Sequence, residues 1–459
     1  MTSPEFLSGL TEICGKNHVL HEAADCWPYG YDNSRRHHLP DAVVFPQCHD
    51  HVLEIVRFCN QRKIPLIARG RGTGTTGATV PINGGIVMSF EKMAEIIRIE
   101  PENRLIITQP GTTNQQIQDA AAQHGFFWPP DPTSASFCSI GGNLAYNSAG
   151  PRAVKYGTPR ENTLGLRAVT GTGDDIRTGV QTSKGVVGFD LTRLLIGSEG
   201  MLAIITEATL KLTPLPETKR TMQALYDDIG SAAQAVAAIM AQPMTPCALE
   251  FIDAKAIEMI RDYSNADLPE NAGAMLMIEV DGANEAIDSA VSHIRQAAQN
   301  SGLLDWTVAE NKEQIDALWR TRKALSPALR TVAPKKINED VVVPVSRIPE
   351  LIYGLDKLAN NFGITIVNFG HAGNGNIHVN LLINPDDKGQ LKNAELCLDE
   401  VFSLVLALNG TLSGEHGIGL EKRDFVAREI DPTTMNLMKR IKAQFDPNNI
   451  LNPGKVFPD

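Results

Sequence analysis

The 459-residue sequence contains no run of about 18 consecutive apolar residues, so we expect no membrane-spanning helix. Its seven cysteines are odd in number, scattered and never in a Cys-x-x-Cys pair, which indicates buried thiols in a reducing compartment. A formal net charge of −11 argues against a nucleic-acid partner. No basic segment followed by an apolar run opens the chain, so we expect no secretory signal and a cytoplasmic location.

The length and composition are those of a globular protein with two or three domains. Up to residue 216 the chain is rich in Gly, Thr, Pro and Asn; from Lys219 onward strands alternate with longer helices. We therefore predict an α+β protein with domains at 1–216 and 217–420 and a segment at 421–459 that packs back on the first domain. The predicted strands are 41–46, 64–69, 202–212, 274–280, 338–343 and 365–369, and the predicted helices are 51–61, 231–241, 285–299, 349–361 and 393–408.

A glycine-rich segment, Arg69-Gly-Arg-Gly-Thr-Gly-Thr-Thr-Gly77, contains the spacing Gly-x-Gly-x-x-Gly. In a dinucleotide-binding fold that spacing is followed at once by a helix, whose N-terminus holds the pyrophosphate. Here Pro81 and the Asn83-Gly84-Gly85 turn would break such a helix. We predict instead a strand–loop–strand cradle whose backbone amides bind phosphate. A tight structural turn is the alternative.

Two segments carry the densest set of chemically active side chains. Residues 371–378 read His-Ala-Gly-Asn-Gly-Asn-Ile-His, and Glu415-His416 lie within Gly-Glu-His-Gly. On one straight strand the two histidines would point to opposite faces, because they are seven residues apart, so we expect a turn or hairpin that brings them together.

Two imidazoles and Glu415 can then hold a divalent cation, while His416 is left to move a proton. A single histidine is usually a surface or core residue, and Glu415-His416 could be a helix-capping turn. Three of the eleven histidines in two glycine-bracketed segments favour function.

Motifs along nearly the whole chain resemble one flavoprotein family. They are Arg69-Gly-x-Gly-Thr, then Pro129-Pro-Asp-Pro followed by Ile140-Gly-Gly-Asn-x-Ala-x-Asn147, then Gly197-Ser-Glu-Gly200 and Asn452-Pro-Gly-Lys455. The first three resemble the FAD domain of vanillyl-alcohol-oxidase-like flavoproteins. With the histidine segments, the chain resembles the FAD-linked D-2-hydroxyacid dehydrogenases, which act on D-lactate, glycolate or D-2-hydroxyglutarate.

This resemblance implies a two-subdomain FAD domain, a substrate (cap) domain and a C-terminal segment that returns to the FAD domain. Some relatives attach FAD through a histidine in the first loop, but none lies between Ile64 and Gly85, so we predict non-covalent FAD. The expected FAD contacts are Arg69, Gly70, Gly72, Thr73, Gly74, Gly77, Pro130, Asp131, Ser139, Gly142, Asn143, Asn147, Gly150, Glu199, Ile204 and Asn452.

The resemblance also implies roles in the substrate domain. A divalent metal (Zn, Mn or Fe) would sit on His371, His378 and Glu415. The expected catalytic residues are His416, Arg322, Lys336 and Asn380, with His416 as the base and Arg322 as the carboxylate-binding group. Relatives that act on D-2-hydroxyglutarate have a lysine where this chain has Asn338, so we favour a monocarboxylate, D-lactate, with glycolate and D-2-hydroxyglutarate as alternatives.

In the implied reaction, hydride passes from the substrate to flavin N5 and electrons then pass to a quinone, an electron-transfer flavoprotein or a cytochrome. We also expect a homodimer and a peripheral contact with the inner face of a membrane. Use of O₂ as an oxidase is the nearest rival. Two other classes stay open: a non-haem iron site that activates O₂, and a subunit that binds FAD for assembly without turnover.

Overall fold

The computed structural model describes residues 4–264 and 269–458 and divides into two compact units. The first unit comprises Met1–Ala149, Gly157–Leu215 and Glu415–Asp459, and the second comprises Gly150–Tyr156 and Pro216–Gly414. The predicted boundaries at 216 and 420 therefore lie one and six residues beyond the unit boundaries at 215 and 414. None of the helices among the described residues is both long and apolar enough to cross a bilayer.

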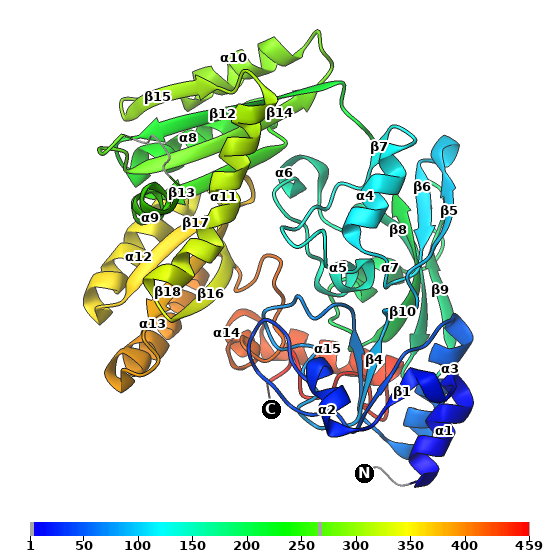
Figure 1. Cartoon of the computed structure of the whole chain (residues 1–459). Coiled ribbons are helices and arrows are strands. Elements are labelled where there is room, and N and C mark those ends of the chain that lie inside the picture. The colour runs from blue at the N-terminus through cyan, green and yellow to red at the C-terminus, as the bar shows by residue number, and fades with distance from the viewer. Residues whose placement is uncertain (1–3, 265–268, 459) are drawn as a thin grey trace. The chain divides into compact units, whose positions relative to one another are not determined.

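The first unit contains two main sheets (Figure 1). One has four strands in the order β1-β2-β4-β3, of which β2, β4 and β3 run parallel; the other is antiparallel with the order β5-β6-β10-β8-β9. Short strands β7 and β11 pair separately. The strands are β1 Val19–Leu20, β2 Ala42–Val44, β3 Leu66–Arg69, β4 Ile86–Ser89, β5 Ile96–Glu100, β6 Leu105–Thr108, β7 Phe126–Phe127, β8 Thr163–Thr170, β9 Asp175–Gly179, β10 Ala203–Lys211 and β11 Thr213–Pro214.

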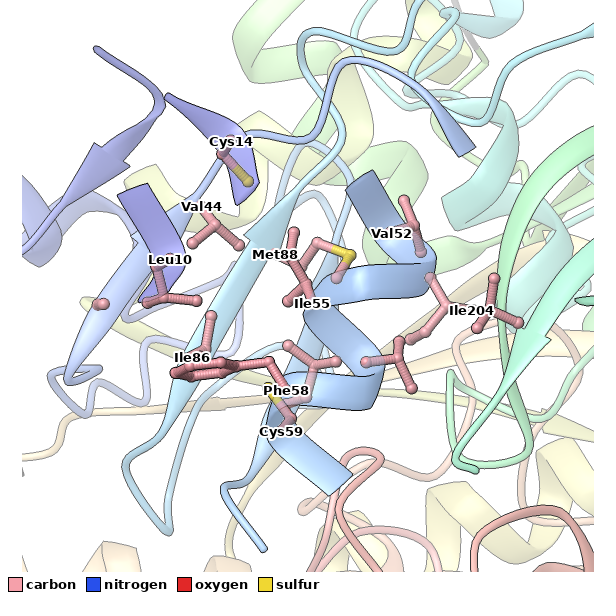
Figure 2. Packing of buried hydrophobic residues seen from close by; sticks show 14 of the residues in the cluster. Leu10, Cys14, Val44, Val52, Ile55, Phe58, Cys59, Ile86, Met88 and Ile204 are labelled. Carbon is pink, nitrogen blue, oxygen red and sulfur yellow. The ribbon is translucent and has the colours of Figure 1, made fainter. Parts of the chain in front are cut away.

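Helix α3 shows why the helices of this unit form and where they pack. Its buried residues Val52, Ile55, Val56 and Cys59 recur at helical spacing and make one apolar stripe. The stripe packs against Met88 of β4 and other members of one core cluster (Figure 2). The helices of the first unit are α1 Pro4–Cys14, α2 Ala23–Cys26, α3 His49–Arg62, α4 Asn114–Ala122, α5 Ile140–Tyr146, α7 Leu191–Leu195, α14 Val426–Glu429 and α15 Pro432–Phe445.

The second unit is built on one seven-stranded sheet with the order β15-β12-β14-β13-β17-β18-β16 (Figure 1). All of its neighbouring strands run antiparallel. The strands are β12 Thr218–Tyr226, β13 Ala248–Asp253, β14 Ala274–Gly282, β15 Leu303–Val308, β16 Lys335–Val342, β17 Thr365–His371 and β18 Asn376–Ile383. The helices are α6 Ala153–Tyr156, α8 Ile229–Ala241, α9 Ala254–Ser264, α10 Ile287–Ala298, α11 Lys312–Val332, α12 Ile348–Phe362 and α13 Lys388–Ala407.

One face of this sheet is covered by α9 and α11. Ile252 and Phe369 of the sheet share a buried cluster with Ile257 of α9 and with Leu325 and Leu329 of α11. Alternate strand residues face the opposite side, and these are also buried, Phe251 and Leu381 among them. Polar residues on the α9–α11 face therefore lie in an apolar setting, and they need partners there.

Candidate functional site

The glycine-rich loop joins two parallel strands, β3 and β4. Residues 70–85, all of which the structure describes, form bends and turns and contain no helix. The predicted strand–loop–strand arrangement is therefore present, and the helix of a dinucleotide-binding fold is absent from residues 70–85, as Pro81 and the glycine turn indicated. Gly70 has no room for a side chain, because a Cβ there would lie 2.1 Å from the Ser139 hydroxyl. Gly72 has a φ of 66°, and its Cβ would meet the Arg69 guanidinium at 2.2 Å.

The buried Arg69 side chain holds this loop in place by hydrogen bonds. Its Nη1 donates to the carbonyl of Tyr31 at 2.6 Å and to the hydroxyl of Thr79 at 3.3 Å. Burial lowers the pKa of Arg69, against the opposing effect of Asp32. The guanidinium thus positions the loop, and it also lines the cavity described below.

A second segment meets the loop at the start of α5. Ser139 is the N-cap, whose hydroxyl accepts from the backbone N–H of Gly142 at 3.3 Å. Asn147 ends the helix in the left-handed conformation, with a φ of 58°. Asn143 is buried and accepts from Asn114, whose amide also donates to the carbonyl of Pro130. These bonds join α5 to the Pro129–Pro132 segment.

The loop and α5 line a cavity within the first unit that is partly open to solvent. Its lining includes five of the residues predicted to contact FAD: Arg69, Gly70, Ser139, Gly142 and Glu199. Ile204 lies elsewhere: its side chain is in the hydrophobic core (Figure 2), while its neighbours Ala203 and Ile205 line the cavity. Strand alternation explains this difference.

Glu199 is the acidic group of the cavity wall. Its carboxylate accepts the backbone N–H groups of Ile418 and Gly419 at 2.6 and 2.8 Å. Burial raises the pKa of Glu199 to about 7, despite the opposing effect of these two donors. The Asn452 amide donates to the Glu199 carbonyl at 2.8 Å, so Asn452 supports the cavity wall from behind.

The other predicted FAD contacts are not in the cavity lining. Thr73 and Gly74 are held by Asn33, through bonds to their carbonyl groups. Gly77 has a φ of 77°. Asp131 donates its backbone N–H to Ala149. Gly150 belongs to the short segment that groups with the second unit.

In the second unit, His371 and His378 lie on the predicted hairpin. Strand β17 ends at His371, residues Ala372–Asn374 make a turn, and β18 starts at Asn376. Phe369 pairs with His378 in the register, so the two histidines are diagonal neighbours on one face. Their ring centroids are 5.2 Å apart with the planes at 84°. Gly375 permits the turn, because it has a φ of 72° and a Cβ there would be 1.9 Å from the Val343 carbonyl.

Glu250 was not among the residues predicted from sequence. Its Oε1 accepts from His371 Nδ1 at 2.6 Å, and its Oε2 accepts from Arg322 Nε at 2.7 Å. Burial alone would raise the pKa of Glu250, but the charges and hydrogen bonds of His371 and Arg322 outweigh it and lower the pKa to about 2. The signal in the sequence is a carboxylate within the apolar strand Ala248-Leu-Glu-Phe-Ile-Asp253.

The chain crosses from the second unit to the first at the peptide bond between Gly414 and Glu415. Gly414 is anchored by its N–H, which donates to Asp340 Oδ2 at 3.0 Å, and Asp340 is the cross-strand partner of His378. Glu415 follows this anchored residue directly along the chain. One ligand atom from each of His371, His378 and Glu415 lies within 4.8 Å of the others.

His416 follows this crossover residue. Its carbonyl accepts from the Thr76 hydroxyl of the glycine-rich loop at 3.2 Å. On the neighbouring Gly417, with a φ of 78°, a Cβ would lie 2.7 Å from Glu199 Oε1. The backbone of the predicted base therefore lies beside the wall of the cavity in the first unit.

Asn380 and Lys336 are on the β18 and β16 strands of the sheet. The Asn380 amide donates to the carbonyls of Val367 and His378, and its oxygen accepts from Asn338 at 2.7 Å. Most of the hydrogen-bonding capacity of the Asn380 amide is therefore used within the sheet, where it positions neighbouring groups. Lys336 is half-buried and lies two residues before Asn338, on the same face of β16.

Comparison with known families decides the class of the protein. Residues 215–456 match the model of the C-terminal domain of FAD-linked oxidases, and residues 40–179 match a FAD-binding domain. The chain belongs to the FAD-linked oxidase family. It is a FAD-dependent oxidoreductase, and the cavity of the first unit lies in the part that includes the FAD-binding match.

Curated relatives of this FAD-linked oxidase extend over nearly its whole length. It is 38% identical over 458 residues to glycolate oxidase subunit GlcD of Bacillus subtilis (strain 168), covering 100% of this chain and 97% of the relative. Identity is 37% to D-lactate dehydrogenase of Archaeoglobus fulgidus, covering 90% of each chain. It is 32% to D-2-hydroxyglutarate dehydrogenase of Stutzerimonas stutzeri (strain A1501), covering 100% of each.

Solved structures support the predicted fold. The structure of p-cresol methylhydroxylase with bound substrate matches with a TM-score of 0.84 and 19% identity, over 99% of this chain and 96% of that chain. 4-Ethylphenol oxidase from Gulosibacter chungangensis matches with a TM-score of 0.78 and 18% identity, over 100% and 98%. The fold is that of the vanillyl-alcohol-oxidase type, as the motifs predicted.

Proposed function

We propose that this FAD-linked oxidase oxidises a D-2-hydroxy acid to the 2-oxo acid, with D-lactate as the favoured substrate. The observation that carries the proposal is the donor set His371, His378 and Glu415, whose ligand atoms lie within 4.8 Å of one another. The Arg322 guanidinium is linked to this set through Glu250. A 2-hydroxy acid offers a hydroxyl for a metal and a carboxylate for an arginine, so its two polar groups match the two kinds of site.

The residues present fit both groups that the family implies. Two imidazoles and one carboxylate are a usual set for a divalent transition metal with positions left for substrate. Glu250 accepts from His371 Nδ1, which leaves Nε2 of that ring to be the ligand. Gly70 and Gly72 lie where side chains would clash with the protein, and Gly70 lines the cavity of the first unit. When bound, FAD supplies the two-electron acceptor and the cation supplies a Lewis acid.

Arg322 is the group that we assign to the substrate carboxylate. Its Nε is engaged by Glu250, so its two terminal nitrogens form the edge that can hold a carboxylate by parallel hydrogen bonds. The guanidinium carbon also lies 4.9 Å from the centroid of the Phe369 ring. These contacts on two sides restrict the side chain and orient the bound acid.

His416 is the group that we assign to the hydroxyl proton. The residue stands between Glu415 and Gly417, and its backbone is tied to the glycine-rich loop through Thr76. A neutral imidazole has an acceptor nitrogen, so it can take up the proton of the hydroxyl and release it afterward.

The substrate-facing strand β16 favours an acid with one carboxylate. Asn338 donates its amide to Asn380 at 2.7 Å and brings no positive charge to this position. A second carboxylate would need a cationic partner to replace its hydration. We therefore place D-lactate ahead of D-2-hydroxyglutarate; glycolate is the second candidate, because the Bacillus relative carries that name. For the reduced flavin we propose a quinone, an electron-transfer flavoprotein or a cytochrome as acceptor.

Anaerobic titration of the purified FAD-loaded protein tests the proposal. D-lactate, L-lactate, glycolate and D-2-hydroxyglutarate are added separately while flavin absorbance is followed near roughly 450 nm, since the flavin receives the electrons. We expect rapid bleaching by D-lactate and none by L-lactate. Faster bleaching by glycolate would select the second candidate. A flavin that stays oxidised with all four acids, in protein that retains its metal, would overturn the proposed function.

A further inference from the structure

We propose that Glu250 is a positioning residue that fixes both the metal-ligating nitrogen of His371 and the orientation of Arg322, and so links metal affinity to carboxylate affinity. The proposal rests on the proposed function above and extends it to a residue without direct contact to metal or substrate. Its basis is the pair of hydrogen bonds at 2.6 and 2.7 Å from one buried carboxylate.

The sheet register places Glu250 between its two partners. Phe251 pairs with Gly370, so Glu250 lies across from His371 on the neighbouring strand and on the same face. Helix α11 covers that face, and from it Arg322 reaches the second oxygen of the carboxylate. Glu250 is 1% exposed, so water does not compete for either bond.

The bond to His371 decides which ring nitrogen can bind a metal. A carboxylate only accepts, so the proton of a neutral His371 must lie on Nδ1, and the lone pair must lie on Nε2. A carboxylate behind a metal-ligating histidine fixes the tautomer and the ring orientation and increases the basicity of the ligand. The His378 ring, whose centroid lies 5.2 Å from that of His371, then has a neighbouring ligand ring of fixed orientation.

The bond to Arg322 decides where the carboxylate clamp points. One oxygen of Glu250 holds Nε, while the Phe369 ring lies against the guanidinium at 4.9 Å. Glutamate can satisfy both donors because it has two acceptor oxygens. A glutamine has one acceptor oxygen and one amide donor, so it can satisfy only one of them in the same geometry.

Glu250→Gln therefore has a specific chemical consequence. If the glutamine oxygen faces Arg322, its amide donates to His371 Nδ1 and moves the ring proton to Nε2, where it blocks metal binding. If the amide faces Arg322, two donors oppose each other and the guanidinium loses its anchor. In either arrangement the glutamine disturbs one of the two groups, His371 or Arg322, directly. It disturbs the other because both groups contact the same side chain.

The test is Mn²⁺ binding to metal-stripped, FAD-loaded protein, measured from the EPR signal of free Mn²⁺. We expect the Mn²⁺ Kd of Glu250→Gln to rise by roughly 10- to 100-fold, as for other disrupted outer partners of metal ligands. The KM for the acid that bleaches the wild-type flavin should also rise, while the flavin spectrum stays as in wild type.

Glu279→Gln is the matched control. Glu279 is also a buried carboxylate of this sheet, 4% exposed, and it bonds Trp319 of α11 together with Thr221. It thus tests whether loss of any buried carboxylate next to α11 has the same effect. We expect its Mn²⁺ Kd to stay within about twofold of wild type, since it does not orient a metal ligand.

A Glu250→Gln protein that binds Mn²⁺ and acid as wild type does would overturn the inference. So would an equal loss in Glu279→Gln. If Glu250→Gln fails to retain FAD, Glu250→Asp is measured instead: its shorter side chain keeps the charge but cannot reach both donors, and unchanged Mn²⁺ affinity would again overturn the inference. Wild-type protein that neither binds Mn²⁺ nor bleaches with any acid would instead refute the proposed function.

Discussion

A methyl group added at Gly70 should couple the glycine-rich loop to the α5 cap in a measurable way. The Cβ of an alanine at this position would lie 2.1 Å from the Ser139 hydroxyl and 3.4 Å from the Ser139 Cβ. The Gly70 backbone is not in the left-handed region, so the clash with the serine is the main cost. The hydroxyl must move, and it then loses the N–H of Gly142.

We expect Gly70→Ala to cost about 3 kcal/mol, from about 1–3 kcal/mol of overpacking and about 1 kcal/mol for the lost cap. Ser139→Ala alone should cost about 1 kcal/mol. In the double variant the closest contact with residue 139 relaxes to the 3.4 Å of the Cβ atoms, which is tight but tolerable. The double variant should therefore cost about 1–2 kcal/mol instead of the sum of about 4 kcal/mol, which is a coupling of about 2–3 kcal/mol.

The assay is urea unfolding of the apoprotein, together with a fluorescence titration of FAD into each variant. Gly70→Ala should weaken FAD binding by at least about tenfold, because about 1.4 kcal/mol of distortion at the cavity wall corresponds to that factor. Adding Ser139→Ala should restore part of the affinity. If the cost of the double variant equals the sum of the two single costs within about 0.5 kcal/mol, the reasoning is refuted, because independent sites add in this way. Wild-type FAD affinity in Gly70→Ala would refute it as well.

Three further predictions concern proton binding, turnover and the core. Burial raises the pKa of Asp253 from 3.8 to about 6, so between these pH values the folded state binds more protons than the unfolded state, and the free energy of unfolding should fall as pH rises. Relative to Asp253→Asn, wild type should lose up to about 3 kcal/mol between pH 4 and 7, measured by urea unfolding. A difference between the two proteins that does not change with pH would contradict this prediction. His416→Ala should keep FAD but slow flavin reduction by roughly 10²–10⁴-fold in stopped-flow measurements, and an unchanged rate would remove it as the base. Ile55 is fully buried in the α3 cluster (Figure 2), so Ile55→Ala should cost about 3–4 kcal/mol and lower Tm, whereas a cost below about 1 kcal/mol would mean that this core can collapse around the gap.

Local signals in the sequence predicted much of the fold correctly. Pro81 and the glycine turn at Gly84-Gly85 excluded a helix after the glycine-rich loop, because proline and paired glycines act on the backbone wherever they stand. The odd spacing of His371 and His378 required a turn between them, and the structure has it. The helix α3 follows from an apolar stripe that the residues carry themselves.

Long-range pairing was beyond those signals. Periodicity shows that a strand has a buried face, but it does not show which strand lies beside it. The sequence therefore predicted strands that alternate with helices in the second domain but not their order in space, and the structure joins seven strands in one antiparallel sheet. Ile204 was among the FAD contacts that the family resemblance implies, and strand alternation places its side chain in the core.

For the candidate site, too, local sequence showed one part and long-range contacts showed another. The residue types of the candidate site are visible in short motifs of the sequence: three imidazoles, a carboxylate and the glycines of the first loop. Only the tertiary structure showed Glu250, which is 121 residues from His371 and 72 residues from Arg322 along the chain. The register of β13 against β17 and the packing of α11 bring the three together. These contacts join segments that are distant along the chain. The burial of apolar faces determines them, and no local sequence pattern encodes them.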